Sequence, residues 1–124
     1  MIVLDTHAIV WFAMGEGIGR QSRRLVDKAF AEEGLAVSTI SFWELAMLVT
    51  KQRVRSIRSA GEQRSKMLAA GIRELPVTGE IAILAAELDG LHNDPADRII
   101  AATAIAHEAT LVTADARLLH GGIP

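Results

Sequence analysis

The first ten residues constrain the fold more than any other stretch of the sequence. The run Met1–Leu4 is apolar throughout, and Asp5 ends it. A short uninterrupted apolar run is typical of a strand that is buried on both faces of a parallel sheet. From Thr6 onward the apolar residues have helical spacing, so we expect Asp5 to lie where a strand passes into a helix. In open α/β sheets ligands bind at this edge, but Asp5 could equally serve only as a helix N-cap.

The composition narrows the class of protein. A chain of 124 residues is long enough for one domain with a real core, and we expect residues 1–124 to form a single domain. Half of the residues are hydrophobic but only 4% are aromatic, which favours an α/β core of Ala, Leu, Ile and Val. The absence of Cys excludes disulfides and thiolate metal sites.

Charge and hydropathy exclude further classes. A net charge of −2 argues against coating nucleic acid through bulk charge, although it permits a local basic face. The N-terminus does not have the pattern of a signal peptide. The longest apolar runs fall far short of the ~20 residues of a membrane helix. We therefore expect a soluble, cytoplasmic protein without a membrane partner.

Three other acidic residues lie at comparable places in the sequence. Glu44 belongs to an apolar helix expected over residues 38–51, and Asp97 lies in the first turn of a buried helix that begins after Asp94 and Pro95. Asp115 follows a short apolar strand at residues 111–112. Glu44 and Asp97 each have a purely structural alternative: Glu44 fits a capping box with Ser41, and Asp97 complements a helix dipole.

The remaining elements follow from periodicity and from helix-end signals. We expect further helices over residues 20–33, 59–70 and 79–88, with further strands at residues 35–37 and 73–75. Strands that alternate with helices predict a parallel sheet with helices on its faces. Such a sheet brings the ends of its strands, and with them the four acids, to one edge.

Four converging carboxylates would repel one another and raise one another's pKa unless a cation lay among them. Ligand sets made only of oxygen suit Mg²⁺ or Mn²⁺ rather than zinc. The four histidines lack the paired spacing of a zinc site and are interpreted as structural or surface residues. One or two such ions would activate water and stabilise the leaving oxygen in phosphodiester hydrolysis.

A basic run lies at residues 51–66, which contain six basic residues and one acid, Glu62. Runs of this kind are commonly a solvated helical face. An excess of positive charge could also bind a phosphate backbone, with an affinity that falls as salt rises. The candidate substrate-binding residues in this run are Lys51, Arg53, Arg55 and Arg58.

Taken together, these motifs resemble the PIN-domain endoribonucleases, specifically the VapC-type toxins of bacterial toxin–antitoxin pairs. The resemblance covers nearly the whole chain and rests on four segments in order: residues 2–6, 38–45, 94–104 and 111–115. No single segment is specific, but their order and spacing are.

The resemblance implies a three-layer, Rossmann-like PIN fold with about four to five parallel strands. It also implies a Mg²⁺- or Mn²⁺-dependent endoribonuclease that cuts single-stranded regions of RNA, a homodimer, and a cognate antitoxin that occludes the site. By position, Asp5, Glu44, Asp97 and Asp115 match the acidic quartet of the family. Thr113 matches a supporting hydroxyl residue, Thr6 is expected to support the site through its backbone, and Asp94 is interpreted as a cap.

One departure from the family pattern concerns the C-terminus, where the chain ends at Pro124 before the usual last strand. Receiver domains and haloacid-dehalogenase-type phosphatases fit less well, because their characteristic acidic pairs are absent. The remaining alternative is a catalytically silent PIN-like module that binds RNA or protein.

Overall fold

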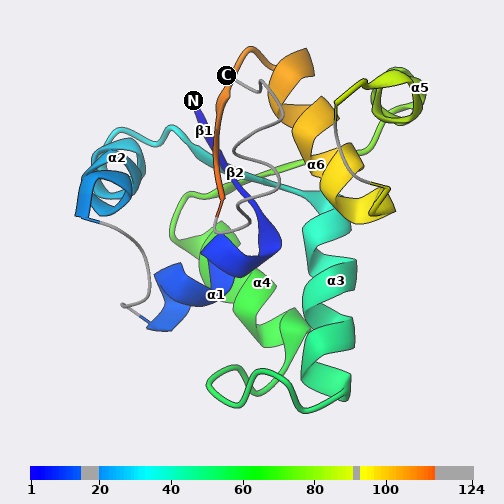
Figure 1. Cartoon of the computed structure of the whole chain (residues 1–124). Coiled ribbons are helices and arrows are strands. Elements are labelled where there is room, and N and C mark those ends of the chain that lie inside the picture. Colours follow the sequence, from blue (N-terminus) through cyan, green and yellow to red (C-terminus); the bar gives the residue numbers. More distant parts are fainter. Residues whose placement is uncertain (15–19, 91–92, 114–124) are drawn as a thin grey trace.

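The computed structural model describes residues 1–14, 20–90 and 93–113. In these ranges the chain forms a parallel sheet with helices on both faces (Figure 1). The strands are β1 (Ile2–Leu4), β2 (Leu35–Ser38), β3 (Arg73–Leu75) and β4 (Thr110–Val112). The helices are α1 (Thr6–Met14), α2 (Arg20–Ala31), α3 (Thr39–Thr50), α4 (Ala60–Ala69), α5 (Gly79–Glu87) and α6 (Pro95–Ala106). The predicted three-layer α/β fold is confirmed.

The order of the strands creates a ligand-binding edge. The sheet runs β3-β2-β1-β4, and every pair is parallel. The chain therefore moves outward from β1 to β2 and β3, and then returns to place β4 on the other side of β1. Where strand order reverses in this way, a crevice opens at the carboxyl ends of the strands. In this chain that crevice lies beyond Leu4 and Val112, which are register partners.

The side chains of the central strands alternate between two cores. Ile2 and Leu4 of β1 pack into one cluster with residues of α1, α2, α3 and α4. Val3 points to the opposite face and packs against Ile100 and Ala104 of α6. A third cluster joins α5 to the outer side of α6. Because both faces are covered, the strands are apolar without interruption, as the sequence predicted.

The helix expected over residues 38–51 is α3, and the structure decides which serine caps it. Ser38, not Ser41, is the N-cap of α3, and its side chain accepts a hydrogen bond from the backbone of Ile40. Ser41 lies inside the helix, is fully buried, and its Oγ has no hydrogen-bond partner in the described part of the chain. The capping-box interpretation of Glu44 therefore fails, because Glu44 lies more than one turn into α3.

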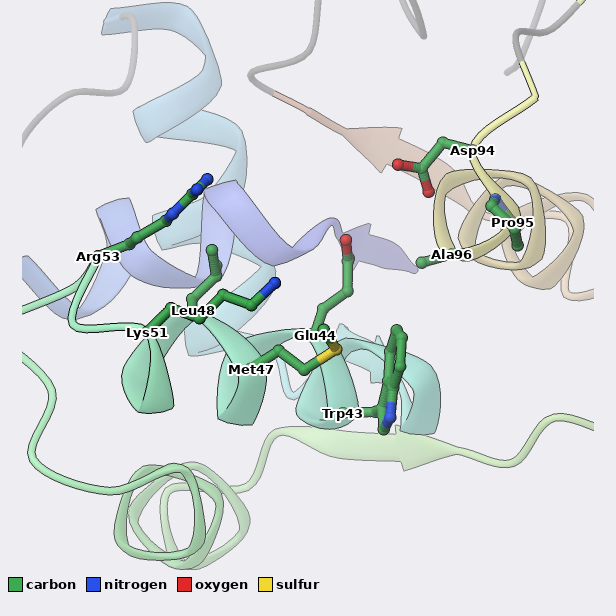
Figure 2. A pocket seen from close by; sticks show the side chains of 9 residues that line it. All are labelled: Trp43, Glu44, Met47, Leu48, Lys51, Arg53, Asp94, Pro95 and Ala96. Carbon is green, nitrogen blue, oxygen red and sulfur yellow. The ribbon is translucent and has the colours of Figure 1, made fainter.

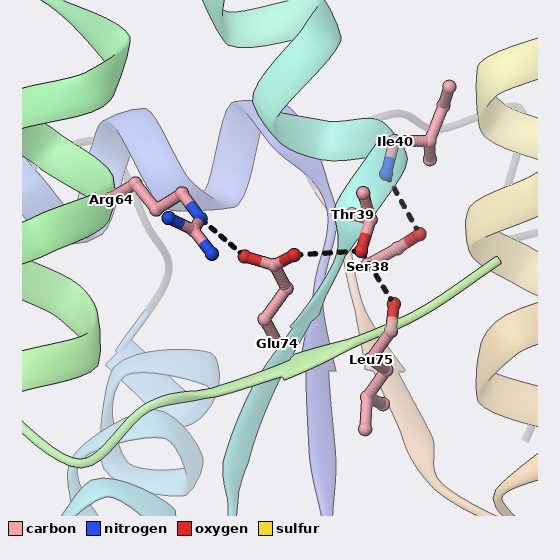
Figure 3. Close-up of polar contacts among 6 residues, drawn as sticks. All are labelled: Ser38, Thr39, Ile40, Arg64, Glu74 and Leu75. Carbon is pink, nitrogen blue, oxygen red and sulfur yellow. Dashed lines mark hydrogen bonds and ion pairs between the residues drawn. The ribbon is translucent and has the colours of Figure 1, made fainter.

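A polar network fixes the N-terminal end of α3 against β3 (Figure 3). The Thr39 hydroxyl donates to Glu74 Oε2 at 3.0 Å and to the carbonyl of Leu75 at 3.2 Å. Glu74 also pairs with Arg64 of α4, whose guanidinium lies over the ring of Phe42. The helix that carries Glu44 is therefore held at its first residue by β3, and Arg64 of α4 supports this contact through Glu74.

Arg98 of α6 closes the C-terminal end of α5. Its guanidinium donates hydrogen bonds to the carbonyls of Ala85, Ala86 and Leu88. These carbonyls lie at a helix end and have no intrahelical donor, so a cation there also complements the helix dipole. In the described part of the chain, no helix is long and apolar enough to cross a bilayer.

We expect Arg98→Ala to lower the free energy of unfolding by about 1–3 kcal/mol, because it leaves the carbonyls at the end of α5 without their charged donor. Urea unfolding monitored by circular dichroism measures this change. Arg24→Ala is the matched control, since Arg24 is exposed on α2 and its loss should change stability by less than about 0.5 kcal/mol. Equal stabilities of the two variants would contradict the role assigned to Arg98.

Candidate metal centre

Asp5 lies at the carboxyl end of β1 and is 2% exposed. Its Oδ1 accepts a hydrogen bond of 2.7 Å from the backbone N–H of Ala8, so it does cap α1. Its Oδ2 accepts a hydrogen bond from the hydroxyl of Thr113, the residue that follows β4. Asp5 is therefore both a cap and a carboxylate held at the crevice between β1 and β4.

Glu44 reaches the same edge from α3 and is half-buried. Its Oε1 accepts a hydrogen bond from the hydroxyl of Thr6, so Thr6 contacts the site through its side chain, where a role of its backbone was expected. Burial raises the pKa of the Glu44 carboxyl, and the charges of Asp94 and Asp5 raise it further. The bond from Thr6 and the nearby His7 oppose this rise in pKa.

Asp97 and Asp94 come from the N-terminal end of α6. Asp94 is the N-cap, and its Oδ1 accepts a hydrogen bond of 3.1 Å from the backbone N–H of Asp97. Asp97 is 8% exposed and lies in the first turn, where the helix dipole favours negative charge. Both features agree with the placement expected from the sequence.

The structure brings Glu44, Asp94 and Asp97 together. One carboxylate oxygen from each lies within 4.8 Å of the others. Sequence reasoning missed Asp94 as a member of this cluster because its role as a cap was a sufficient explanation. Residues three apart on a helix lie on the same side of it, so the sequence places Asp94 beside Asp97, but its distance from Glu44 depends on how α3 and α6 pack.

The residues present fit a hard divalent cation. Three oxygen donors converge from α3 and α6, and the charge of Asp5 is close enough to act on Glu44. Burial is the main cause of the raised pKa of Glu44, and the charges of Asp94 and Asp5 add to it, so a bound cation would favour the ionised carboxylate. Carboxylate oxygens are the donors that Mg²⁺ and Mn²⁺ prefer.

A pocket of about 260 Å³ opens beside the carboxylates (Figure 2). Its lining residues come from α3, from the segment after α3 and from the start of α6: Trp43, Glu44, Met47, Leu48, Lys51, Arg53, Asp94, Pro95 and Ala96. Two of the four candidate basic residues, Lys51 and Arg53, therefore lie near the acids. Arg55 and Arg58 are exposed on the connection between α3 and α4 but do not line this pocket.

Asp115 lies outside the described residues, as does the segment in which a fifth strand was in question. Its position relative to the other acids therefore stays a prediction from the sequence.

Comparisons with known proteins identify the family. The family model of the PIN domain matches residues 2–122. The chain belongs to the PIN domain family. The PIN-domain fold and the family resemblance expected from the sequence are thus confirmed.

Individual relatives agree with this assignment. Ribonuclease VapC22 of Mycobacterium tuberculosis is 34% identical over 119 residues, which are 94% of this chain and 88% of that protein. The crystal structure of M. tuberculosis VapC20, a sarcin-ricin loop cleaving toxin, superposes with a TM-score of 0.68 at 18% identity, covering 100% of this chain and 97% of that one. A toxin–antitoxin complex from Klebsiella pneumoniae gives 0.63 at 23% identity, covering 100% and 93%. The structural likenesses show a shared fold.

Proposed function

We propose that this PIN domain is a divalent-metal-dependent endoribonuclease and the toxin of a toxin–antitoxin pair. The observation that carries the proposal is the cluster of Glu44, Asp94 and Asp97, whose oxygens lie within 4.8 Å of one another at the ligand-binding edge of the sheet. The 34% identity to a VapC ribonuclease over nearly the whole chain supports this reaction.

We propose that Mg²⁺ or Mn²⁺ is held by the converging carboxylates of Glu44, Asp94 and Asp97 together with Asp5. Asp115 is the fourth acid of the family quartet. When bound, the ion would supply an activated water and stabilise charge on the phosphodiester oxygens. The hydroxyls of Thr6 and Thr113 hold the Glu44 and Asp5 carboxylates in place. The N-terminal end of α6 orients Asp97 and offsets part of its charge.

Three partners follow from this proposal. The substrate is RNA, cut in single-stranded regions. A cognate antitoxin blocks the site, in keeping with the toxin–antitoxin complex among the structural neighbours. The active form is a homodimer, as the family resemblance implies.

The test is cleavage of RNA by the purified chain. We expect a structured RNA with single-stranded loops to be cut endonucleolytically when Mg²⁺ or Mn²⁺ is present, and to stay intact when EDTA is added. Readdition of the metal in excess should restore cleavage. If the RNA stays intact with either metal although circular dichroism shows that the protein is folded, a catalytically silent binding module is the better interpretation.

A further inference from the structure

One face of α3 changes character along its length. A stripe along one side of α3 begins at Glu44. It continues with the residues three, four and seven positions later, which are Met47, Leu48 and Lys51. The stripe runs from an acid through two apolar side chains to a cation. All four line the pocket beside the carboxylates (Figure 2).

Trp43 adds an aromatic wall to this pocket. Its side chain is 58% exposed, although an indole ring is among the most favourable groups to bury. It lines the pocket together with Met47 on α3 and with Pro95 and Ala96 at the start of α6. A large exposed aromatic group beside a cluster of carboxylates does nothing for the core and is suited to contact a ligand.

The far end of the pocket is cationic. Lys51 and Arg53 are both exposed, and neither side chain forms an ion pair with a residue that the structure describes. At a rise of about 1.5 Å per residue, Lys51 lies roughly 10 Å along α3 from Glu44. The pocket thus presents a metal-holding end, an apolar middle and a cationic end in that order.

We propose that this pocket binds one nucleotide of single-stranded RNA next to the bond that is cut. The base stacks on Trp43 beside Met47, and the next phosphate of the RNA, beyond Leu48, contacts Lys51 and Arg53. The order of groups along α3 carries the assignment, because Met47 and Leu48 separate the carboxylates from the cations as a nucleoside separates two phosphates of a nucleic acid strand. This subsite rests on the ribonuclease activity proposed above.

The subsite also explains a preference for unpaired RNA. In a duplex, both faces of a base are covered by its neighbours, so only an unstacked base can lie on an aromatic side chain. Stacking on an aromatic group tolerates any base, because every base has a π-face. The pocket therefore selects single strands without reading their sequence at this position.

We expect Trp43→Ala to raise KM for a single-stranded RNA substrate about tenfold or more, with kcat changed by less than about threefold. Trp43→Phe should keep most of the affinity because it retains an aromatic face. Leu25→Ala is the matched control, since Leu25 is a comparably exposed apolar residue (49%) on α2. The control should leave both constants unchanged.

A substrate with an abasic ribose at the nucleotide beside the cleaved bond tests the base directly. With the normal chain, this substrate should lose as much affinity as Trp43→Ala loses with the intact substrate. Combining the two changes should cost no more than either alone, because both remove the same contact. Additive losses would overturn the stacking assignment.

Fluorescence separates this subsite from catalysis. The chain has two tryptophans, Trp11 and Trp43, so Trp11→Phe leaves Trp43 as the only indole. In EDTA, a single-stranded oligoribonucleotide should quench this indole and a duplex of the same sequence should not. Quenching in a chain that cuts no RNA would keep the subsite and reject the proposed function.

The cationic end has an internal control. Arg53→Gln should reduce the slope of log affinity against log salt, because one phosphate contact is lost. Arg55→Gln should leave the slope unchanged, because Arg55 does not line the pocket. If Trp43→Ala cuts RNA with an unchanged KM but is no longer inhibited by the cognate antitoxin, then Trp43 contacts the antitoxin and not the RNA. This result would overturn the proposal.

Discussion

Asp97→Asn is expected to reduce metal-dependent RNA cleavage by about 1,000-fold or more while leaving the fold intact. A metal site supplies several kcal/mol of transition-state stabilisation, and each 1.36 kcal/mol corresponds to a tenfold change in rate. Asn has the shape of Asp without the charge, so the first turn of α6 should persist. Measurements of kcat/KM with Mn²⁺, and of Mn²⁺ affinity by calorimetry, check both parts of the expectation.

Asp5→Asn should reduce metal-dependent RNA cleavage by a similar factor. This substitution also separates the effect of the charge from that of the helix cap. Asn is as good an N-cap as Asp, so its side chain can still accept the hydrogen bond from Ala8. A loss of cleavage with unchanged unfolding would therefore report on the charge and not on the cap. Asp89→Asn, at an exposed acid in a loop, is the control. Cleavage at the normal rate in either variant would reject the assigned metal centre.

The sequence predicted the fold well because its elements carry strong local signals. The apolar runs at residues 2–4 and 35–37 form buried strands, and Asp94 is the N-cap of α6, as expected. The capping box proposed for Ser41 and Glu44 is wrong, because Ser38 and Ser41 are both good caps in isolation and Ser38 is the one that caps α3. Which of them caps the helix depends on where β2 ends, which is a property of the sheet.

The site was harder to predict than the fold. That Asp5, Glu44 and Asp97 share an edge follows from parallel topology alone. The membership of Asp94 does not follow, because it depends on the distance between α3 and α6. The hydroxyl bond from Thr6 to Glu44 and the exposure of Trp43 likewise depend on how these helices pack. Contacts across elements of this kind carry no local signal in the chain.

Glu44→Gln tests whether Glu44 is a metal ligand or a structural residue. For a metal ligand, we expect the substitution to lower RNA cleavage and to raise the stability of the metal-free chain. We expect cleavage to fall by about 100-fold or more, because an amide is a much weaker ligand for a hard cation than a carboxylate. In EDTA, however, the variant should unfold at a higher temperature than the normal chain. Burial and the charges of Asp94 and Asp5 disfavour the ionised Glu44, and Gln removes that cost while it can still accept the bond from Thr6.

The same substitution shows whether the Glu44 carboxyl makes the folded chain less stable as pH rises. Because the pKa of Glu44 is raised above its ordinary value of 4.5, the folded chain binds this proton more tightly than the unfolded chain does. Its contribution to stability is therefore present at low pH and is lost as pH rises through the raised pKa. Urea unfolding in EDTA across this range should show the normal chain losing stability relative to Glu44→Gln as pH rises. Glu87→Gln, at an exposed acid of α5, should follow the normal chain at every pH. If the difference in stability between the normal chain and Glu44→Gln stays constant with pH, the ionised Glu44 carboxylate is already stabilised without metal. The electrostatic argument for a cation at this edge of the sheet would then fail.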